Sequence, residues 1–204
     1  MKTGIILLAA GSSSRLGRAK QLIEFQGKTL IQKAIDEAKK SEANCLVVVL
    51  GSNPGLIQTG FDISSTPFIV NPDWQHGMSS SMQSGLRFLM EKEDVDQVVL
   101  MLCDQPFVDA SLLDQLITAK ETSGKGIVAA AYFNTLGVPA LFDGRYFEDL
   151  FQLTGSEGAK KVIFNHQAEV QALDFPLGAV DLDTEEDVNQ FLILYPQKNL
   201  PNPS

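Results

Sequence analysis

The sequence predicts an α/β fold with three layers, in which helices cover both faces of a mostly parallel sheet. Two observations support this prediction. Apolar runs without polar alternation recur along the 204 residues, at 5–10, 45–50 and 98–103, as is typical of strands that are buried on both faces. Segments with apolar residues at helical spacing separate these runs, and such alternation favours a parallel sheet.

The first part of the chain is predicted to form a strand, a loop, a helix and a second strand. The first apolar run ends at Gly11, and apolar residues then recur at helical spacing over 30–38. The second buried run, at 45–50, is followed by a glycine- and proline-containing turn at 51–55 and by a short strand at 68–70. This order is that of a β-loop-α-β unit.

The alternation continues to the end of the chain. Apolar spacing over 78–91 predicts a helix, and we expect Met78 and Met82 to lie in its core-facing stripe. The later elements are expected to be a strand at 98–103, a helix around 112–117, a strand at 127–131, an extended piece at 137–142, a helix at 159–165, a strand at 170–173 and a helix beginning at Thr184. We expect one domain over residues 1–198 and a frayed tail at 199–204.

Composition and charge exclude several classes of partner. The chain has 16 Lys and Arg against 25 Asp and Glu, a net charge of −9, which argues against broad binding to nucleic acid or to anionic membranes. Its longest apolar runs are too short for a membrane-spanning helix. We find no secretory cleavage pattern, and we expect Cys45 and Cys103 to be small buried residues rather than a disulfide or a metal pair. A cytoplasmic location is therefore expected.

Residues 11–20 form a candidate phosphate-binding loop after the first strand, where open α/β sheets bind ligands. Glycines allow close backbone approach to a phosphate, and Arg15 and Lys20 can neutralise a polyphosphate. The spacing of Gly11 and Gly17 matches neither the Walker loop nor the dinucleotide fingerprint. An ordinary solvated basic loop is the alternative.

Asp104 is a candidate metal ligand, because it directly follows a buried strand and precedes Gln105 and Pro106. A carboxylate at a strand's end can hold Mg²⁺ together with substrate phosphates. The alternative is that Asp104 caps the next helix, but Asp109 and Ser111 are better placed for that role.

A second pair of carboxylates precedes the last helix. Asp181 and Asp183 flank Leu182, and they point to the same side if the backbone is extended. This arrangement suits a second carboxylate on the same metal, and which of the two would bind it stays open. The alternative is an acidic helix start at Thr184, which the helix dipole favours.

These motifs, in this order, resemble those of the molybdenum cofactor nucleotidyltransferases. The resemblance is strongest to the cytidylyltransferase branch, in which the first strand ends in Leu-Ala-Ala-Gly and the metal motif reads Asp-Gln-Pro. The matching residues are Leu8-Ala9-Ala10-Gly11-Ser12, Arg15-Leu16-Gly17, Lys20, Asn71-Pro72-Asp73-Trp74, Gly77-Met78-Ser79-Ser80-Ser81, Asp104-Gln105-Pro106, Gly137-Val138-Pro139 and Asp181-Leu182-Asp183-Thr184.

The resemblance implies a Rossmann-like nucleotidyltransferase domain of the nucleotide-diphospho-sugar transferase type. It implies Mg²⁺-dependent transfer of CMP from CTP to the phosphate of molybdopterin, with release of pyrophosphate, and a molybdenum hydroxylase or its cofactor chaperone as partner. Transfer from another nucleoside triphosphate, transfer to another acceptor such as a sugar phosphate, and non-catalytic cofactor binding stay as alternatives. A nicotinamide-dependent oxidoreductase is disfavoured, because Ser13 stands where its fingerprint needs glycine.

The resemblance also implies roles for particular residues. Arg15, Lys20 and Asp104 would be catalytic, and Asp104, Asp181 and Asp183 would hold the metal. The implied nucleotide-binding residues are Leu8, Ala9, Ala10, Gly11, Ser12, Arg15, Lys20, Ser79, Ser80, Ser81, Asp104 and Gln105, of which Ala10 and Gln105 would favour cytosine.

One segment departs from the family pattern. Ser156 and Lys160 stand where relatives usually carry an aspartate and an arginine. Lysine lacks the planar fork with which arginine binds phosphate, so the identity of the acceptor stays open.

Overall fold

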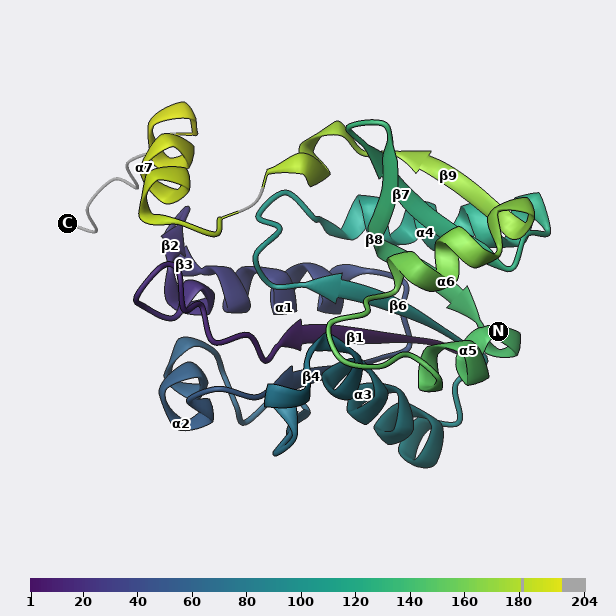
Figure 1. Cartoon of the computed structure of the whole chain (residues 1–204), viewed down its shortest axis with the longest axis horizontal. Helices are drawn as coiled ribbons and strands as arrows, with labels where there is room; N and C mark the ends of the chain where they lie inside the picture. The colour runs from purple at the N-terminus through teal and green to yellow at the C-terminus, as the bar shows by residue number, and fades with distance from the viewer. Residues whose placement is uncertain (181, 196–204) are drawn as a thin grey trace.

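A seven-stranded sheet forms the centre of the computed structural model, which describes residues 1–180 and 182–195 (Figure 1). The strands have the order β5-β4-β1-β6-β8-β7-β9. Every pair is parallel except the two made by β8, so the predicted mostly parallel sheet is confirmed. The strands are β1 (Thr3–Ala9), β4 (Cys45–Leu50), β5 (Phe68–Val70), β6 (Gln97–Leu102), β7 (Ile127–Tyr132), β8 (Thr135–Asp143) and β9 (Val170–Asp174). The expected tail at 199–204 lies outside the described residues.

Strand β1 is central, and its position explains where the candidate loop lies. It pairs in parallel with β4 and β6, so that Leu8 lies opposite Val49 and Leu102. All of its residues are buried, as the unbroken apolar run predicts. The carboxyl ends of these parallel strands share one edge of the sheet. The segments that follow β1, β4 and β6 therefore meet there.

Helices cover both faces of the sheet, so the three-layer fold is confirmed. Successive residues of β1 enter opposite cores, because side chains alternate across a strand. Ile5 and Leu7 pack with the helices on one face, and Ile6 and Leu8 with those on the other. The first face carries α1 (Leu30–Lys40) and α4 (Ala110–Ser123), and the second carries α3 (Met78–Glu93), α5 (Phe147–Phe151) and α6 (Lys160–Asn165).

A third, smaller core attaches the last helix to the loop after β1. Helix α7 (Glu185–Leu194) lies beside a small hairpin, β2 (Glu24–Phe25) and β3 (Lys28–Thr29) (Figure 1). The rings of Phe25 and Phe191 pack 4.6 Å apart, and Leu182 is fully buried among them. Thr184 caps α7 in a reciprocal capping box with Asp187, as its hydroxyl predicts. The start of α7 is thereby fixed near the candidate phosphate loop.

Some short elements differ from the prediction. Helix α2 (Pro54–Ile57) begins within the segment predicted as a turn at 51–55, and the β2–β3 hairpin and α5 had no predicted counterpart. Such elements are too short for apolar periodicity to reveal them. Cys103 is buried as expected, whereas Cys45 is partly exposed, and both are free thiols. No helix among the described residues is long and apolar enough to span a membrane.

Two glycines provide a matched test of how α3 packs on the sheet. At Gly85, an added Cβ would lie 2.6 Å from Ile6 Cγ2 and 2.9 Å from Val49 Cγ2. We expect Gly85→Ala to lower the free energy of unfolding by about 1–3 kcal/mol, because the core there has no free volume. Gly55 in α2 faces open space, so Gly55→Ala should be neutral or slightly stabilising. Urea unfolding measures both, and equal stabilities would contradict this packing.

Candidate functional site

The loop after β1 is held in place by a buried glutamine. Gln21 is 1% exposed, and its Nε2 donates to the carbonyl oxygens of Ala9 and Gly11, each at 3.0 Å. The backbone N–H of Lys20 donates to Ser13 Oγ at 3.1 Å. These bonds fold the loop back on itself, so that Lys20 returns to the end of the strand from which the loop began.

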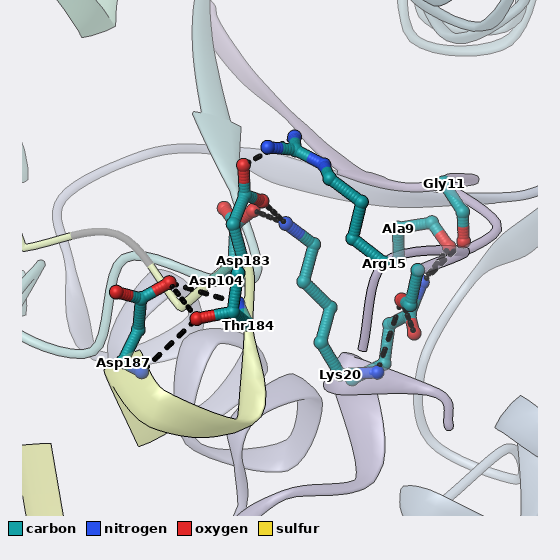
Figure 2. A network of polar contacts seen from close by, with 10 residues as sticks. Ala9, Gly11, Arg15, Lys20, Asp104, Asp183, Thr184 and Asp187 are labelled. Carbon is teal, nitrogen blue, oxygen red and sulfur yellow. Dashed lines mark hydrogen bonds and ion pairs between the residues drawn. The ribbon is translucent and has the colours of Figure 1, made fainter. Parts of the chain in front are cut away.

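Lys20 joins two carboxylates that are far apart in the sequence. Its Nζ lies 2.5 Å from Asp104 Oδ2 and 2.9 Å from Asp183 Oδ1 (Figure 2). Arg15 makes a further ion pair with Asp183. The side chains of Lys20 and Asp104 are only 15% and 14% exposed. We call Lys20, Asp104 and Asp183 the lysine clasp.

The clasp fixes the charge of Lys20 and Asp183. Burial of the Lys20 ammonium opposes its charge, but the charge and hydrogen bonds of Asp104 and Asp183 outweigh this effect and raise the pKa of Lys20. A hydrogen bond from Lys20 lowers the pKa of Asp183, and the charges of Lys20 and Arg15 act in the same direction. Partial burial of Asp183 opposes this effect without outweighing it. Both groups are therefore charged at neutral pH.

The two carboxylates of the clasp are suited to a divalent cation. One oxygen of Asp104, Oδ1, is buried and has no hydrogen-bond partner among the described residues, although buried carboxylate oxygens normally have one. Asp104 Oδ2 and Asp183 Oδ1 already converge on a cation, the Lys20 ammonium. Hard oxygen ligands of this kind are those that Mg²⁺ prefers.

The protein itself would supply only part of the coordination shell. The described residues contain no cluster of three or more His, Cys, Asp or Glu side chains that could hold a metal ion. Mg²⁺ commonly takes one or two protein carboxylates and completes its shell with substrate phosphates and water. The predicted ligand Asp181 lies outside the described residues.

A cavity of about 320 Å³ opens beside the clasp, within the size range of small-ligand pockets. It contains most of the predicted nucleotide-binding residues, namely Leu8, Ala9, Ala10, Gly11, Ser12, Lys20, Ser81 and Asp104. Trp74 and Met78 form apolar parts of its wall. Gly51 allows this wall to approach β1, because a Cβ there would lie 2.6 Å from Trp74 Cβ.

Ser79 and Ser80 do not line this cavity, although they belong to the predicted set. The hydroxyl of Ser79 donates to the carbonyl oxygen of Gly155 at 2.8 Å, and the hydroxyl of Ser80 lies 2.9 Å from the carbonyl oxygens of Asp73 and Gly77. These serines connect the start of α3 to neighbouring loops, so their polar groups are already used within the fold.

Gln105 and Arg15 also lie outside the first cavity. Gln105 lines a second cavity of about 320 Å³, which shares Leu102 and Asp104 with the first, and its Nε2 donates to the carbonyl oxygen of Val138 at 2.9 Å. Arg15 is turned toward Asp183. Asp104 therefore lines both cavities. Gln105, which was predicted to favour cytosine, lines only the second.

The sequence pattern assigns no binding role to three residues of the site, Gln21, Trp74 and Met78, and it places Met78 in the core-facing stripe of its helix. Met78 is 46% exposed in the cavity wall rather than in the core, because it lies at the first position of α3. Trp74 could have been predicted to line the site, because it follows β5, which ends at the same edge of the sheet as β4. Gln21 carries no such pattern, because its buried partners are backbone carbonyls.

Comparison with known proteins identifies similar chains. A family model described as the MobA-like NTP transferase domain matches residues 5–170. The chain is 27% identical over 194 residues to purine catabolism protein PucB of Bacillus subtilis, covering 89% of this chain and 92% of that one. It is 29% identical over 135 residues to nicotine blue oxidoreductase of Paenarthrobacter nicotinovorans, covering 66% of this chain and only 63% of that relative.

Several solved structures share the fold of this chain. Rv0371c of Mycobacterium tuberculosis is 26% identical, with a TM-score of 0.82, over 95% of this chain and 98% of that one. Another structure of Rv0371c is a complex with manganese, 24% identical with a TM-score of 0.78 over 95% and 99% of the two chains. Nucleotidyltransferases at 17% and 13% identity share the fold, with TM-scores of 0.80 and 0.72.

Proposed function

Because the chain belongs to the MobA-like NTP transferase domain family and is therefore a nucleotidyltransferase, we propose that it transfers CMP from CTP to the phosphate of a molybdopterin-type acceptor. The observation that carries this proposal is the lysine clasp, in which a cation and two carboxylates meet beside a nucleotide-sized cavity. Phosphoryl transfer depends mainly on positioning of the substrates and on stabilisation of charge. The cavity can position the nucleotide, and the charged side chains of the clasp can stabilise charge.

We place the base and ribose of CTP in the first cavity and its triphosphate along the loop after β1. Apolar walls from Trp74 and Met78 suit a stacked base. The side chain of Ala10 narrows the cavity relative to a glycine, which favours the smaller pyrimidine. The preference for CTP thus rests on Ala10, since Gln105 lies in the second cavity.

Asp104 and Asp183 would hold Mg²⁺, for which their donor set fits. When bound, Mg²⁺ supplies positive charge to the phosphate oxygens. Lys20 now occupies the position between these carboxylates. We therefore propose that Lys20 and Arg15 move from the carboxylates to the triphosphate when CTP binds, which frees both carboxylates for the metal.

The transfer itself needs no covalent intermediate on the chain. An oxygen of the acceptor phosphate forms a bond to the α-phosphorus as the bond to pyrophosphate breaks, and pyrophosphate leaves with that electron pair. Lys20 keeps its proton and neutralises charge on the phosphates, because its pKa is raised. The buried thiol of Cys103 lines the cavity, but burial raises its pKa and keeps it protonated.

A thermal-shift panel tests the choice of nucleotide. We expect CTP with Mg²⁺ to raise the melting temperature more than GTP, ATP or UTP, because a ligand at about 100 times its Kd adds about 2.7 kcal/mol to the stability of the folded state. A larger shift with GTP would contradict the role given to Ala10. NAD belongs in the same panel, since one relative is named an oxidoreductase. A shift with NAD and none with any triphosphate would contradict nucleotidyl transfer.

A further inference from the structure

The buried side chain of Gln21 forms its hydrogen bonds with the end of β1 and with the loop that follows it. Gln21 lies in the 3₁₀ turn Lys20–Leu22, directly after the lysine of the clasp. The carbonyl oxygens of Ala9 and Gly11 converge on its Nε2 (Figure 2). Its Oε1 accepts from the hydroxyl of Ser13 at 3.5 Å. Both ends of the amide are therefore used within the fold, so Gln21 can act on a ligand only through the loop.

These bonds turn the negative ends of three peptide groups toward the protein. A carbonyl oxygen that accepts from Gln21 faces that buried amide and not a phosphate oxygen, which it would repel. The carbonyl oxygen of the residue between them, Ala10, accepts from the backbone N–H of Ser52 at 3.2 Å. The carbonyl groups of Ala9, Ala10 and Gly11 are therefore all occupied by donors of the fold.

The backbone N–H groups that come next are available to an anion. Those of residues 12–15 have no acceptor in the part of the chain that the structure describes. Ser13 lies among them in the left-handed region, at a φ of +51°, and its carbonyl oxygen accepts from the N–H groups of Leu16 and Gly17. Successive N–H groups in such a turn form a concavity that binds anions. The hydroxyl of Ser13 connects this turn to Gln21.

We propose that Gln21 is a positioning residue for the triphosphate of CTP. By holding the carbonyl groups of Ala9 and Gly11 and the hydroxyl of Ser13, it makes the loop present N–H groups to the phosphates in place of carbonyl groups. This inference rests on the proposed function, because the triphosphate is that of CTP. The alternative is that Gln21 only stabilises the fold. The two roles differ in their effect on the binding of phosphate.

Separate titrations of inorganic triphosphate and of cytidine test this role. Methionine has nearly the length of glutamine but donates no hydrogen bond, so Gln21→Met fills the same space without holding the two carbonyl groups. With Mg²⁺ present, isothermal titration calorimetry should show that the variant binds inorganic triphosphate about 10-fold more weakly, as expected for the loss of one hydrogen bond to a charged group. Its affinity for cytidine should be unchanged.

Gln97→Met is the matched control for the loss of a buried amide. Gln97 is 1% exposed, as is Gln21, and its Nε2 donates to Thr3 Oγ1 at 2.8 Å. It lies at the start of β6, at the opposite end of that strand from Asp104. Both variants should lower the melting temperature, because each removes a buried hydrogen bond. Only Gln21→Met should lose affinity for inorganic triphosphate.

Ser13→Ala tests the same network if Gln21→Met does not fold. Ser13 is only partly buried, and alanine removes the bonds from its hydroxyl to Gln21 and from the N–H of Lys20. We expect weaker binding of inorganic triphosphate, by a smaller factor than in Gln21→Met, because Gln21 keeps its bonds to the two carbonyl groups. The affinity for cytidine should again be unchanged.

Three results would overturn the proposal. The first is an affinity of Gln21→Met, or of Ser13→Ala where the former does not fold, for inorganic triphosphate that equals that of the unaltered chain. The second is an equal loss of affinity for cytidine, since the whole site would then be distorted. The third is no binding of inorganic triphosphate to the unaltered chain.

The outcomes also separate this proposal from the proposed function. If Gln21→Met loses affinity for inorganic triphosphate as expected but CTP releases no pyrophosphate with any acceptor, the role of Gln21 stands and the transfer reaction falls. If transfer occurs and Gln21→Met has the triphosphate affinity and the KM for CTP of the unaltered chain, the reaction stands and the role of Gln21 falls.

Discussion

Asp104→Asn is expected to lower the rate of pyrophosphate release by about 10³-fold at saturating CTP and Mg²⁺. The carboxylate follows β6 at the edge where three parallel strands end, and its buried Oδ1 has no hydrogen-bond partner within residues 1–180 and 182–195. Asparagine keeps the shape but loses the negative charge that a divalent cation needs. The far-UV circular dichroism spectrum should be unchanged, because Lys20 retains Asp183 as a partner.

Asp109→Asn is the matched control for this variant. Asp109 lies in the same turn after β6, but its Oδ1 accepts from the backbone N–H of Leu112 and caps α4. Asparagine caps a helix about as well as aspartate, so this variant should have normal activity and stability. Near-normal activity of Asp104→Asn would show that its carboxylate is not a metal ligand.

Lys20→Met should have two opposite effects. Turnover should fall by about 10²-fold or more, as for other single groups that stabilise charge in the transition state. Binding of Mn²⁺ without nucleotide should become tighter, because the ammonium no longer occupies the position between Asp104 and Asp183. Electron paramagnetic resonance titration of free Mn²⁺ measures the second effect without any turnover.

Lys28→Met controls for the loss of a positive charge. Lys28 lies on β3 and pairs with Asp36, away from the clasp, so its loss should leave turnover and Mn²⁺ binding unchanged. If Lys20→Met binds free Mn²⁺ no more tightly than the unaltered chain, the proposed exchange of partners is contradicted even where turnover falls.

The sequence predicts the parts of the fold that depend on local pattern. The unbroken apolar runs of β1, β4 and β6 identify strands buried on both faces, and Asp104 is a candidate metal ligand because it directly follows one of them. Thr184 was found as a helix cap because its hydroxyl and the acidic residues after it act within one turn. These features depend on residues that are neighbours in the chain.

Contacts between distant segments could not be predicted from such patterns. Lys20 meets Asp183 across 163 positions, and this contact depends on α7 packing through Phe191 against Phe25. Ser79 has the residue type of a ligand-binding hydroxyl, yet Gly155 already accepts its hydrogen bond.

Mass spectrometry of the products formed from CTP, molybdopterin and Mg²⁺ tests the proposed reaction most directly. We expect one pyrophosphate for each molecule of a cytidine dinucleotide in which the CMP phosphate is joined to the acceptor phosphate, and loss of both products with Asp104→Asn. Release of free CMP without the joined product, or a dinucleotide formed from GTP in preference to CTP, would contradict CMP transfer by this chain.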